Sequence, residues 1–345
     1  MTDSFRLADY DFAFPETAVA SAPAEPRDSS RLLVLDRRLG TLEHARFSEL
    51  GRWLRAGDCL VLNRTRVVPA RLVGAKPSGG RVELLLLKEL SPGTWTALAS
   101  RVKAGGTILL DGAEAFVEAV ADDGECLLRF STTDVRGLMA RLGTAPLPPY
   151  ILKTRRSAGA PDAAPCDLAR YQTVYADSDG SVAAPTAGLH FTPELLERLR
   201  GSGVRVAELV LHVGRGTFKP VVAEDVREHA MLPEEFEVPA PSAELLARTR
   251  AEGGRVVAVG TTATRTLETL ARAPGTLRGS TALFIRPGHE FKGVDALLTN
   301  FHLPRSTPLL LACAFAGRER ILDAYREALA KGYRLFSYGD SNLVL

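Results

Sequence analysis

Four side chains that can exchange protons stand in segments rich in small or turn-forming residues: His190, His212, His302 and Asp340. A histidine can accept and release a proton near neutral pH without extreme tuning of its pKa, which suits it to acid–base catalysis. The alternative for each is structural, since a histidine can pack inside a turn and an aspartate can cap one. The four are therefore candidates for proton transfer.

The segment at 180–192, GSVAAPTAGLHFT, places small residues and threonines just ahead of a predicted helix with a Thr-Pro start. Backbone N–H groups at a helix start attract anions, and small residues let a ligand approach the backbone. Thr186 and Gly188 are therefore candidate ligand-binding residues. A simple Gly/Ala turn without a ligand is the alternative.

The segment at 212–218, HVGRGTF, follows a predicted strand and contains Gly214, Gly216 and Thr217. Its glycines again let a ligand approach the backbone. It is not a dinucleotide-binding fingerprint, because the third glycine and its helix spacing are missing.

The segment at 256–268, VAVGTTATRTLE, is typical of a strand, a tight turn and a helix. Thr261 and Thr262 would lie at the helix start, where carboxylates and phosphates bind well. Arg265 and Glu268 stand three residues apart on one helical face. They are candidates for ligand binding or for an ion pair with each other.

Loops predicted at 299–307 and 336–342 follow strand-like runs, and such loops build the sites of α/β sheets. Asn300 and Tyr338 are polar candidates there, and the alternative for Asn300 is a structural role in a turn. The sequence contains no GxSxG elbow, P-loop or HExxH motif, so serine hydrolase, P-loop NTPase and metalloprotease functions lack support.

Composition narrows the class of protein. Of 345 residues, 46% are hydrophobic and 24% charged, as in soluble globular proteins. The formal net charge of +2 predicts that any RNA contact uses a local basic patch. The four cysteines show no CxxC spacing, which argues against a zinc site or a disulfide framework. Without a signal peptide or a membrane-spanning run, we expect a cytoplasmic protein with no membrane contact.

Two sequence patterns predict an α/β multidomain fold. From residue 58 to about 131, short apolar runs alternate with glycine turns, which predicts a small antiparallel β-barrel. In the second half, strand-like runs alternate with helices, which predicts an α/β domain with parallel pairing. We expect residues 1–68 and 150–345 to form the major α/β domain, with a smaller β-barrel domain at 69–149 inserted in it.

Two element predictions are specific. The run HARFSELGRWLRAG, residues 44–57, is helix-like. The run TALFI, residues 281–285, is predicted to be a strand.

Nine strings resemble those of the S-adenosylmethionine:tRNA ribosyltransferase-isomerases, in order and almost end to end: RDSSRLLVL, TRVVPARL, SGGRVELLLL, PLPPYI, YQTVYA, GSVAAPTAGLHFT, HVGRGTFKPV, GTTATRTLE and TNFHLPRST. The chain is identified as a member of this family, which belongs to queuosine biosynthesis. The resemblance implies an α/β major domain with a smaller β-barrel domain, in agreement with the two sequence patterns.

The resemblance also implies a reaction. The ribosyl part of S-adenosylmethionine is transferred and isomerised onto 7-aminomethyl-7-deazaguanine at the tRNA wobble position, giving epoxyqueuosine, adenine and methionine. S-adenosylmethionine is a co-substrate, and we expect no recycled cofactor and no metal. The expected partners are S-adenosylmethionine and that tRNA, and we expect a monomer.

Under this hypothesis the candidate residues take three roles. Proton transfer falls to a subset of His190, His212, His302 and Asp340. The residues expected to hold S-adenosylmethionine or substrate are Thr186, Gly188, Gly214, Gly216, Thr217, Thr261, Thr262, Arg265, Glu268, Asn300 and Tyr338. The residues expected to contact tRNA are Arg31, Arg66 and Arg71.

Three positions depart from the family pattern. Arg64 stands where an aspartate is expected, Leu232 where a histidine is expected, and Asn342 where a methionine is expected. Arg64 and Leu232 motivate one alternative, a diverged paralogue that uses S-adenosylmethionine with a small amine or deazapurine acceptor. The barrel and the arginine clusters motivate another, a catalytically silent RNA-binding protein.

Overall fold

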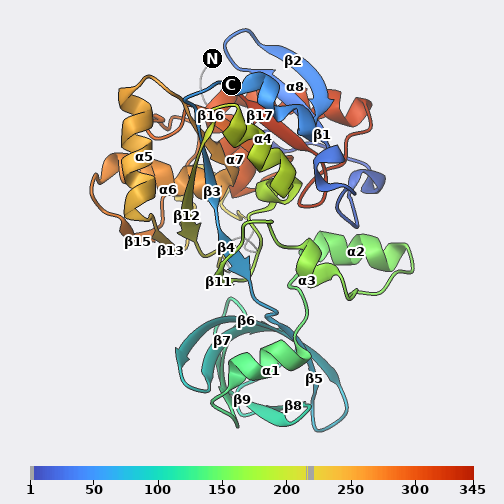
Figure 1. The fold of residues 1–345 in the computed structure, drawn as a ribbon. Coiled ribbons are helices and arrows are strands. Elements are labelled where there is room, and N and C mark those ends of the chain that lie inside the picture. Colours follow the sequence, from blue (N-terminus) through green and yellow to red (C-terminus); the bar gives the residue numbers. More distant parts are fainter. Residues whose placement is uncertain (1–3, 215, 217–220) are drawn as a thin grey trace.

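The protein consists of a helix-flanked sheet and a closed barrel joined by a narrow neck (Figure 1). A computed structural model describes residues 4–214, 216 and 221–345. Both chain ends lie at the sheet end of the molecule, away from the barrel (Figure 1). Within the described ranges, no helix is long and apolar enough to cross a membrane.

The large sheet has nine strands. Their order across the sheet is β15 (Arg278–Thr281), β13 (Glu234–Glu237), β12 (Arg205–Leu211), β3 (Cys59–Asn63), β14 (Val256–Val259), β16 (Ala296–Asn300), β17 (Ser341–Val344), β1 (Arg31–Asp36) and β2 (Thr41–Arg46). Pairing is parallel from β12 through β3 and β14 to β16, and also between β17 and β1. The other pairs are antiparallel. The expected parallel centre is present, within a mixed sheet.

Helices cover both faces of this sheet. One face packs against α5 (Ala240–Ala251), α6 (Gly260–Arg272), α7 (Thr307–Ala316) and α8 (Arg318–Ala330). The other packs against α4 (Pro193–Gly201) and the 3-10 helices η4 (Phe47–Trp53) and η5 (Thr186–His190). In β3, Cys59 and Val61 join the first core, whereas Leu60 and Leu62 join the second. Strands buried on both faces must be apolar throughout, which explains the continuous hydrophobic runs.

The barrel is closed and antiparallel, as its sequence pattern predicts. Its strand order is β10 (Glu125–Phe130), β7 (Thr94–Ala99), β6 (Arg81–Ser91), β5 (Arg71–Ala75), β8 (Thr107–Leu110) and β9 (Ala113–Val120). Inward residues alternate with outward ones and form a core of their own, to which α1 (Val135–Leu142) contributes. Gly79, with φ +87°, makes the predicted turn between β5 and β6.

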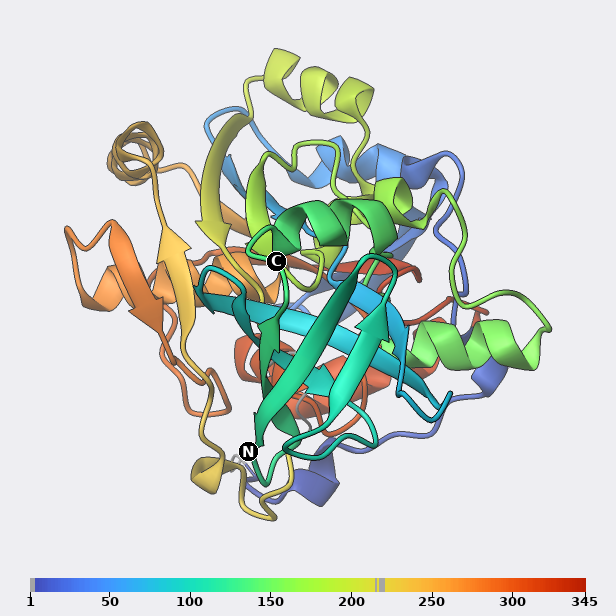
Figure 2. The same cartoon turned by 90° about the horizontal axis from the view of Figure 1, so that it is seen from below.

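At the neck, the segment that leaves the sheet for the barrel lies beside the segment that returns from it. Strand β4 (Thr65–Val67) leads to the barrel and pairs in parallel with β11 (Ser178–Ser181), which follows the return. The return also contains α2 (Pro149–Ser157) and α3 (Asp167–Arg170). In Figure 2, which views the molecule from below, the barrel lies in front of the sheet. A division into domains at residues 68 and 150 stays a prediction.

Further 3-10 helices are η1 (Leu7–Tyr10), η2 (Glu16–Ala18), η3 (Arg27–Ser29) and η7 (Val226–Glu228).

One element prediction holds only in part and another was wrong. Residues 44–57 form the end of β2 and then η4, in which Phe47 and Leu50 are buried. Their three-residue spacing suits the three residues per turn of a 3-10 helix. In the run 281–285 only Thr281 belongs to a strand, because the Arg265 guanidinium donates hydrogen bonds to the carbonyl groups of Thr281 and Leu283 and the chain leaves the sheet there.

Candidate active site

A cavity of about 410 Å³ lies where β12, β14 and β16 end. These strands run in the same direction through the sheet, so their carboxyl ends share one edge, where α/β folds place ligands. Figure 1 shows this edge facing the barrel. Residues that follow the barrel also line the cavity, namely Pro148, Pro149 and Tyr150.

Helix α6 starts at the cavity without an intervening loop. Gly260 has φ +88°, a conformation that favours glycine, and this lets the helix turn directly out of β14. Thr261 and Thr262 line the cavity, as their candidate role requires. The buried Asn63 amide donates to the Thr262 hydroxyl (3.2 Å) and to the Leu211 carbonyl (3.0 Å). Asn63 therefore fixes the ends of β3 and β12 to the start of α6.

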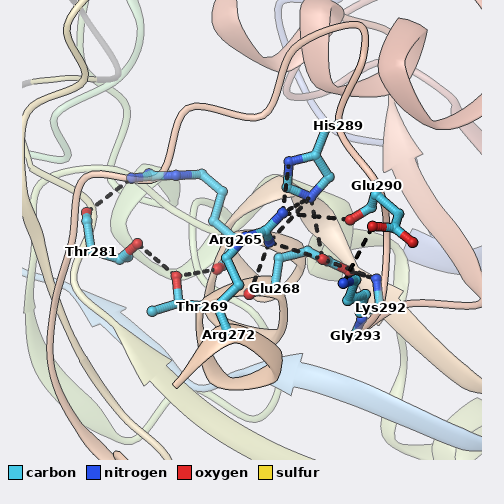
Figure 3. Close-up of polar contacts among 9 residues, drawn as sticks. All are labelled: Arg265, Glu268, Thr269, Arg272, Thr281, His289, Glu290, Lys292 and Gly293. Carbon is cyan, nitrogen blue, oxygen red and sulfur yellow. Dashed lines mark hydrogen bonds and ion pairs between the residues drawn. The ribbon is translucent and has the colours of Figure 1, made fainter. Parts of the chain in front are cut away.

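Arg265 does not pair with Glu268, its neighbour one turn along the helix. Its guanidinium forms a buried ion pair with Glu234 of β13, and both side chains line the cavity. Two further bonds go to the carbonyl groups of Leu283 (3.0 Å) and Thr281 (3.1 Å), the latter drawn in Figure 3. Arg265 thus fixes one wall of the cavity.

Glu268 lies outside the cavity lining and anchors the loop that precedes β16 (Figure 3). Its fully buried carboxylate accepts hydrogen bonds from the backbone N–H groups of Lys292 (3.1 Å) and Gly293 (2.7 Å). It also contacts His289 (3.2 Å) and Arg272 (3.3 Å). Burial alone would raise the pKa of Glu268, but the hydrogen bonds from His289 and the backbone lower it overall. Glu268 is therefore a structural anion.

Of the four proton-transfer candidates, only His302 lines the cavity. Its Nε2 atom lies 2.9 Å from the Thr299 hydroxyl, and its backbone N–H donates to the Tyr325 hydroxyl (3.0 Å). Desolvation lowers the pKa of His302, so the imidazole is neutral near pH 7, the form that can take up a proton, and is a weaker base than a solvent-exposed histidine.

His190 lies behind the cavity wall and contacts it through Asn300. The Asn300 amide donates to His190 Nε2 (3.1 Å), so Nδ1 carries the ring proton and donates to Ser30 (2.8 Å). On the other side, the Thr186 hydroxyl donates to Asn300 Oδ1 (2.8 Å). Burial, followed by the nearby Arg27 charge, lowers the pKa of His190 to about 3. A neutral His190 therefore holds Asn300 and Thr186, which both line the cavity.

The other two proton-transfer candidates lie outside the lining. His212 packs at the neck, with Nδ1 2.8 Å from the Thr65 hydroxyl and its ring against Gly180, where a Cβ would approach within 2.9 Å. Asp340 accepts backbone hydrogen bonds from Arg31 (2.7 Å) and Arg334 (2.8 Å) and so closes a turn. Burial raises the pKa of Asp340 despite these bonds.

The remaining ligand-binding candidates separate into two groups. Gly216 lines the cavity, and the Gly214 N–H donates to the Glu234 carboxylate (3.2 Å). Gly188 and Tyr338 lie outside the lining: a Cβ at Gly188 would collide with Tyr175, and the buried Tyr338 ring packs edge-on against Tyr171. Thr217 lies outside the described residues.

The three arginines predicted to contact tRNA differ in exposure. Arg71 is buried beside the carboxylates of Glu83 (2.7 Å) and Asp162 (3.6 Å). Arg66 is exposed at the neck and donates to the Ala176 carbonyl (2.7 Å). Arg31 is exposed on β1, which belongs to the sheet and not to the barrel.

Sequence reasoning missed three residues of this region: Asn63, Tyr150 and Glu234. A signal for Glu234 exists, because the alternation of β13 puts it on the same buried face as Phe236. A carboxylate on a buried strand face needs a partner. No group of His, Cys, Asp and Glu able to hold a metal ion is found within the ranges the structure describes.

Comparison with known proteins identifies the family. A family model described as "Queuosine biosynthesis protein" matches residues 7–344. The chain is 50% identical over 342 residues to an S-adenosylmethionine:tRNA ribosyltransferase-isomerase of Thermosipho africanus, covering 97% of this chain and 98% of the relative. The chain belongs to this family. A relative of the same name from Anaeromyxobacter dehalogenans is 52% identical over 352 residues, with 99% of each chain covered.

A solved structure supports the same conclusion. The crystal structure of S-adenosylmethionine tRNA ribosyltransferase from Thermotoga maritima covers 98% of this chain and 100% of its own. The TM-score is 0.56 at 38% sequence identity. The predicted family and the predicted α/β fold with a smaller β-barrel are therefore confirmed.

The structure accounts for the three departures from the family pattern in different ways. Arg64 forms an ion pair with Asp177 (2.7 Å), which offsets its charge at the neck. Leu232 packs near Gly216, where a Cβ would lie 3.6 Å from the leucine Cβ. The Asn342 amide donates to the Asn300 backbone carbonyl (3.0 Å) and so supports the cavity edge.

Proposed function

We propose that the protein transfers and isomerises the ribosyl part of S-adenosylmethionine onto 7-aminomethyl-7-deazaguanine at the tRNA wobble position, giving epoxyqueuosine-tRNA, adenine and methionine. One observation carries the proposal: the cavity joins Thr186, Thr261, Asn300 and His302, which come from three separate strings of the family resemblance. The names of the relatives agree with this reaction.

The methionyl end of S-adenosylmethionine binds at the start of α6. The N–H groups of a first helical turn have no partners within the helix and favour a carboxylate. Arg265 has five N–H donors, and its bonds to Glu234, Leu283 and Thr281 use three of them. Two donors of Arg265 are then available to the same carboxylate, beside Thr261 and Thr262.

His302 moves the proton that adenine departure requires. The sulfonium makes the C5′ hydrogens of the ribose acidic, so a base can remove one and start expulsion of adenine, which must itself be protonated. The neutral His302 ring accepts this proton. Because desolvation lowers the pKa of His302, the protonated ring is a strong acid and passes the proton to the departing base.

Asn300 and Thr186 orient the reacting groups, and His190 holds them in place. The unprotonated aminomethyl nitrogen of the tRNA base attacks the activated ribose and loses a proton to His302, which is neutral again after protonating adenine. Collapse of the sulfonium intermediate then expels methionine and forms the epoxide. Holding the polar groups in fixed orientations before the reaction reduces the cost of organising them in the transition state.

The tRNA contacts the neck, which lies beside the cavity. Arg66 is exposed there, has the fixed donor geometry that suits phosphate and has one solvent-exposed carboxylate partner, Asp179 at 3.7 Å. The charge of the buried Arg71 is already offset by two carboxylates. Arg31, which is exposed on β1, contacts the tRNA at a greater distance from the neck. The proposal includes a cytoplasmic location, since tRNA is the acceptor. It also includes a monomeric protein.

The test is a product analysis. The purified protein is incubated with S-adenosylmethionine and tRNA that carries 7-aminomethyl-7-deazaguanine, and mass spectrometry follows adenine, methionine and digested tRNA. Equal amounts of adenine, methionine and epoxyqueuosine are expected. Adenine release with a free deazapurine and no need for tRNA would support the diverged paralogue. Binding of tRNA without consumption of S-adenosylmethionine would support a silent RNA-binding protein.

A further inference from the structure

Tyr150 is an aromatic residue of the cavity wall with no assigned role. It lies in the first turn of α2, directly after the chain returns from the barrel, and lines the cavity beside Pro148 and Pro149. Its side chain is partly exposed, as is that of Phe284 in the same lining, whereas the lining rings of Tyr171 and Phe301 are 1% and 0% exposed. Tyr150 therefore offers accessible aromatic surface to a ligand.

The ring of Tyr150 is held from two sides. Phe336 packs against it with ring centroids 5.1 Å apart, and Phe14 supports Phe336 edge-on at 5.1 Å. The Tyr150 hydroxyl is hydrogen-bonded to the Ser337 hydroxyl. Fixing both the ring and its hydroxyl restricts the rotation of the side chain, so little further order is lost when a ligand binds.

The segment behind Tyr150 has an unusual backbone. Phe336 has φ +70°, a conformation that is disfavoured for a residue with a bulky side chain. Backbone bonds hold it there, from Phe336 N–H to the Phe301 carbonyl (3.1 Å) and from Gly339 N–H to the Phe336 carbonyl (3.0 Å). Asp340 closes the same turn. This conformation presents Phe336 to the ring of Tyr150 and Ser337 to its hydroxyl, and such outliers concentrate at functional sites.

We propose that Tyr150 is the surface on which a purine-like ring stacks in the cavity, either the adenine of S-adenosylmethionine or the deazaguanine of the tRNA. The proposal rests on the proposed function. Aromatic side chains stack on any base through its π face, and both substrates of the proposed reaction carry such a ring. The hydroxyl has no acid–base role, because burial raises the pKa of Tyr150 to about 12 and Ser337 binds it.

Two variants separate the ring from the hydroxyl. Tyr150→Leu removes the ring, and Tyr150→Phe keeps it as the matched control. KM for S-adenosylmethionine and KM for the tRNA are measured separately, with thermal unfolding as a check on folding. Tyr150→Leu is expected to raise one of the two KM values by about 5- to 150-fold, with a smaller change in kcat. Tyr150→Phe is expected to keep both near the wild-type values, and the KM that rises identifies the stacked ring.

The proposal is overturned if Tyr150→Leu folds and leaves both KM values unchanged, or if Tyr150→Phe is impaired as strongly as Tyr150→Leu. Tyr150→Trp gives a second readout, because it keeps a stacking surface and adds a fluorophore. Its emission is expected to fall on titration with S-adenosylmethionine or with the tRNA, relative to the wild-type emission from Trp53 and Trp95. No change with either ligand overturns the proposal even where the wild-type protein shows no turnover, so failure of the reaction and failure of the stacking are distinguishable.

Discussion

The barrel core and the sheet edge at the cavity bury different kinds of side chain. Barrel residues such as Leu84, Val117 and Leu128 form a core built of hydrophobic side chains. The sheet edge buries Asn63, Asn300, His190 and the Arg265–Glu234 pair, each held by specific hydrogen bonds. Burying polar groups costs free energy unless every bond is made. A sheet edge that served stability alone would not need so many buried polar side chains. Their number favours a role of this edge in binding and chemistry.

The largest expected effect is on catalysis at that edge. His302→Ala removes the only proton-transfer candidate that lines the cavity, so kcat should fall by about 10²- to 10⁴-fold. The measurement is the rate of adenine release at saturating S-adenosylmethionine, with circular dichroism as the folding control. A kcat close to that of the wild type would remove His302 from the mechanism.

The matching change in the barrel should affect stability and leave chemistry intact. Leu128 is fully buried in the barrel core, so Leu128→Ala should lower the free energy of unfolding by about 2–5 kcal/mol. Urea unfolding measures this loss. Turnover per folded molecule should stay at the wild-type value below the transition. A large fall in turnover without unfolding would show that the barrel core takes part in catalysis.

The buried His190 should make the protein sensitive to acid. The pKa of His190 is about 3 in the folded protein, against about 6.5 for an unfolded chain, so only the unfolded state binds a proton between these values. The contribution of His190 to stability is therefore present above pH 6.5 and is lost at about 1.4 kcal/mol per pH unit as the pH falls towards 3. The buried His302, whose pKa desolvation also lowers, adds to the same slope. Urea titrations at several pH values measure the slope, and His190→Gln should reduce it by about 1.4 kcal/mol per pH unit. Equal slopes for both proteins would contradict a buried neutral histidine.

The smallest effect is expected at the neck, between the two regions. Arg64 and Asp177 form an ion pair whose side chains are 24% and 53% exposed, so solvent screens their attraction. Arg64→Ala should cost only about 0–1 kcal/mol of stability. A double-mutant cycle with Asp177→Ala measures the coupling. A strong loss of tRNA modification in Arg64→Ala, with stability unchanged, would instead assign Arg64 to substrate binding.

Local sequence patterns predicted much of the fold. Glycine turns and alternating hydrophobic residues predicted the barrel, and the strand–turn–helix pattern at Gly260 predicted the start of α6 at a binding edge. The failure at residues 281–285 and the pairing of Arg265 share one cause, because partners outside the local segment decided them. Arg265 pairs with Glu234 and not with Glu268, which stands three residues away.

The same cause limited the prediction of the site. His190 is held by Ser30 and Asn300, which lie 160 and 110 residues away, so residue type suggested proton transfer where the contacts give a positioning role. Tyr150 gains its position from Phe336 and Ser337, across the whole second half of the chain. No local pattern specifies such contacts.

We place the reaction in the cavity at the sheet edge, and a crystal structure of the protein with bound S-adenosylmethionine tests this placement. The methionyl carboxylate should lie at Thr261, Thr262 and Arg265, with the ribose C5′ beside His302. S-adenosylmethionine bound outside this cavity, or with His302 remote from the ribose, would overturn the proposed function.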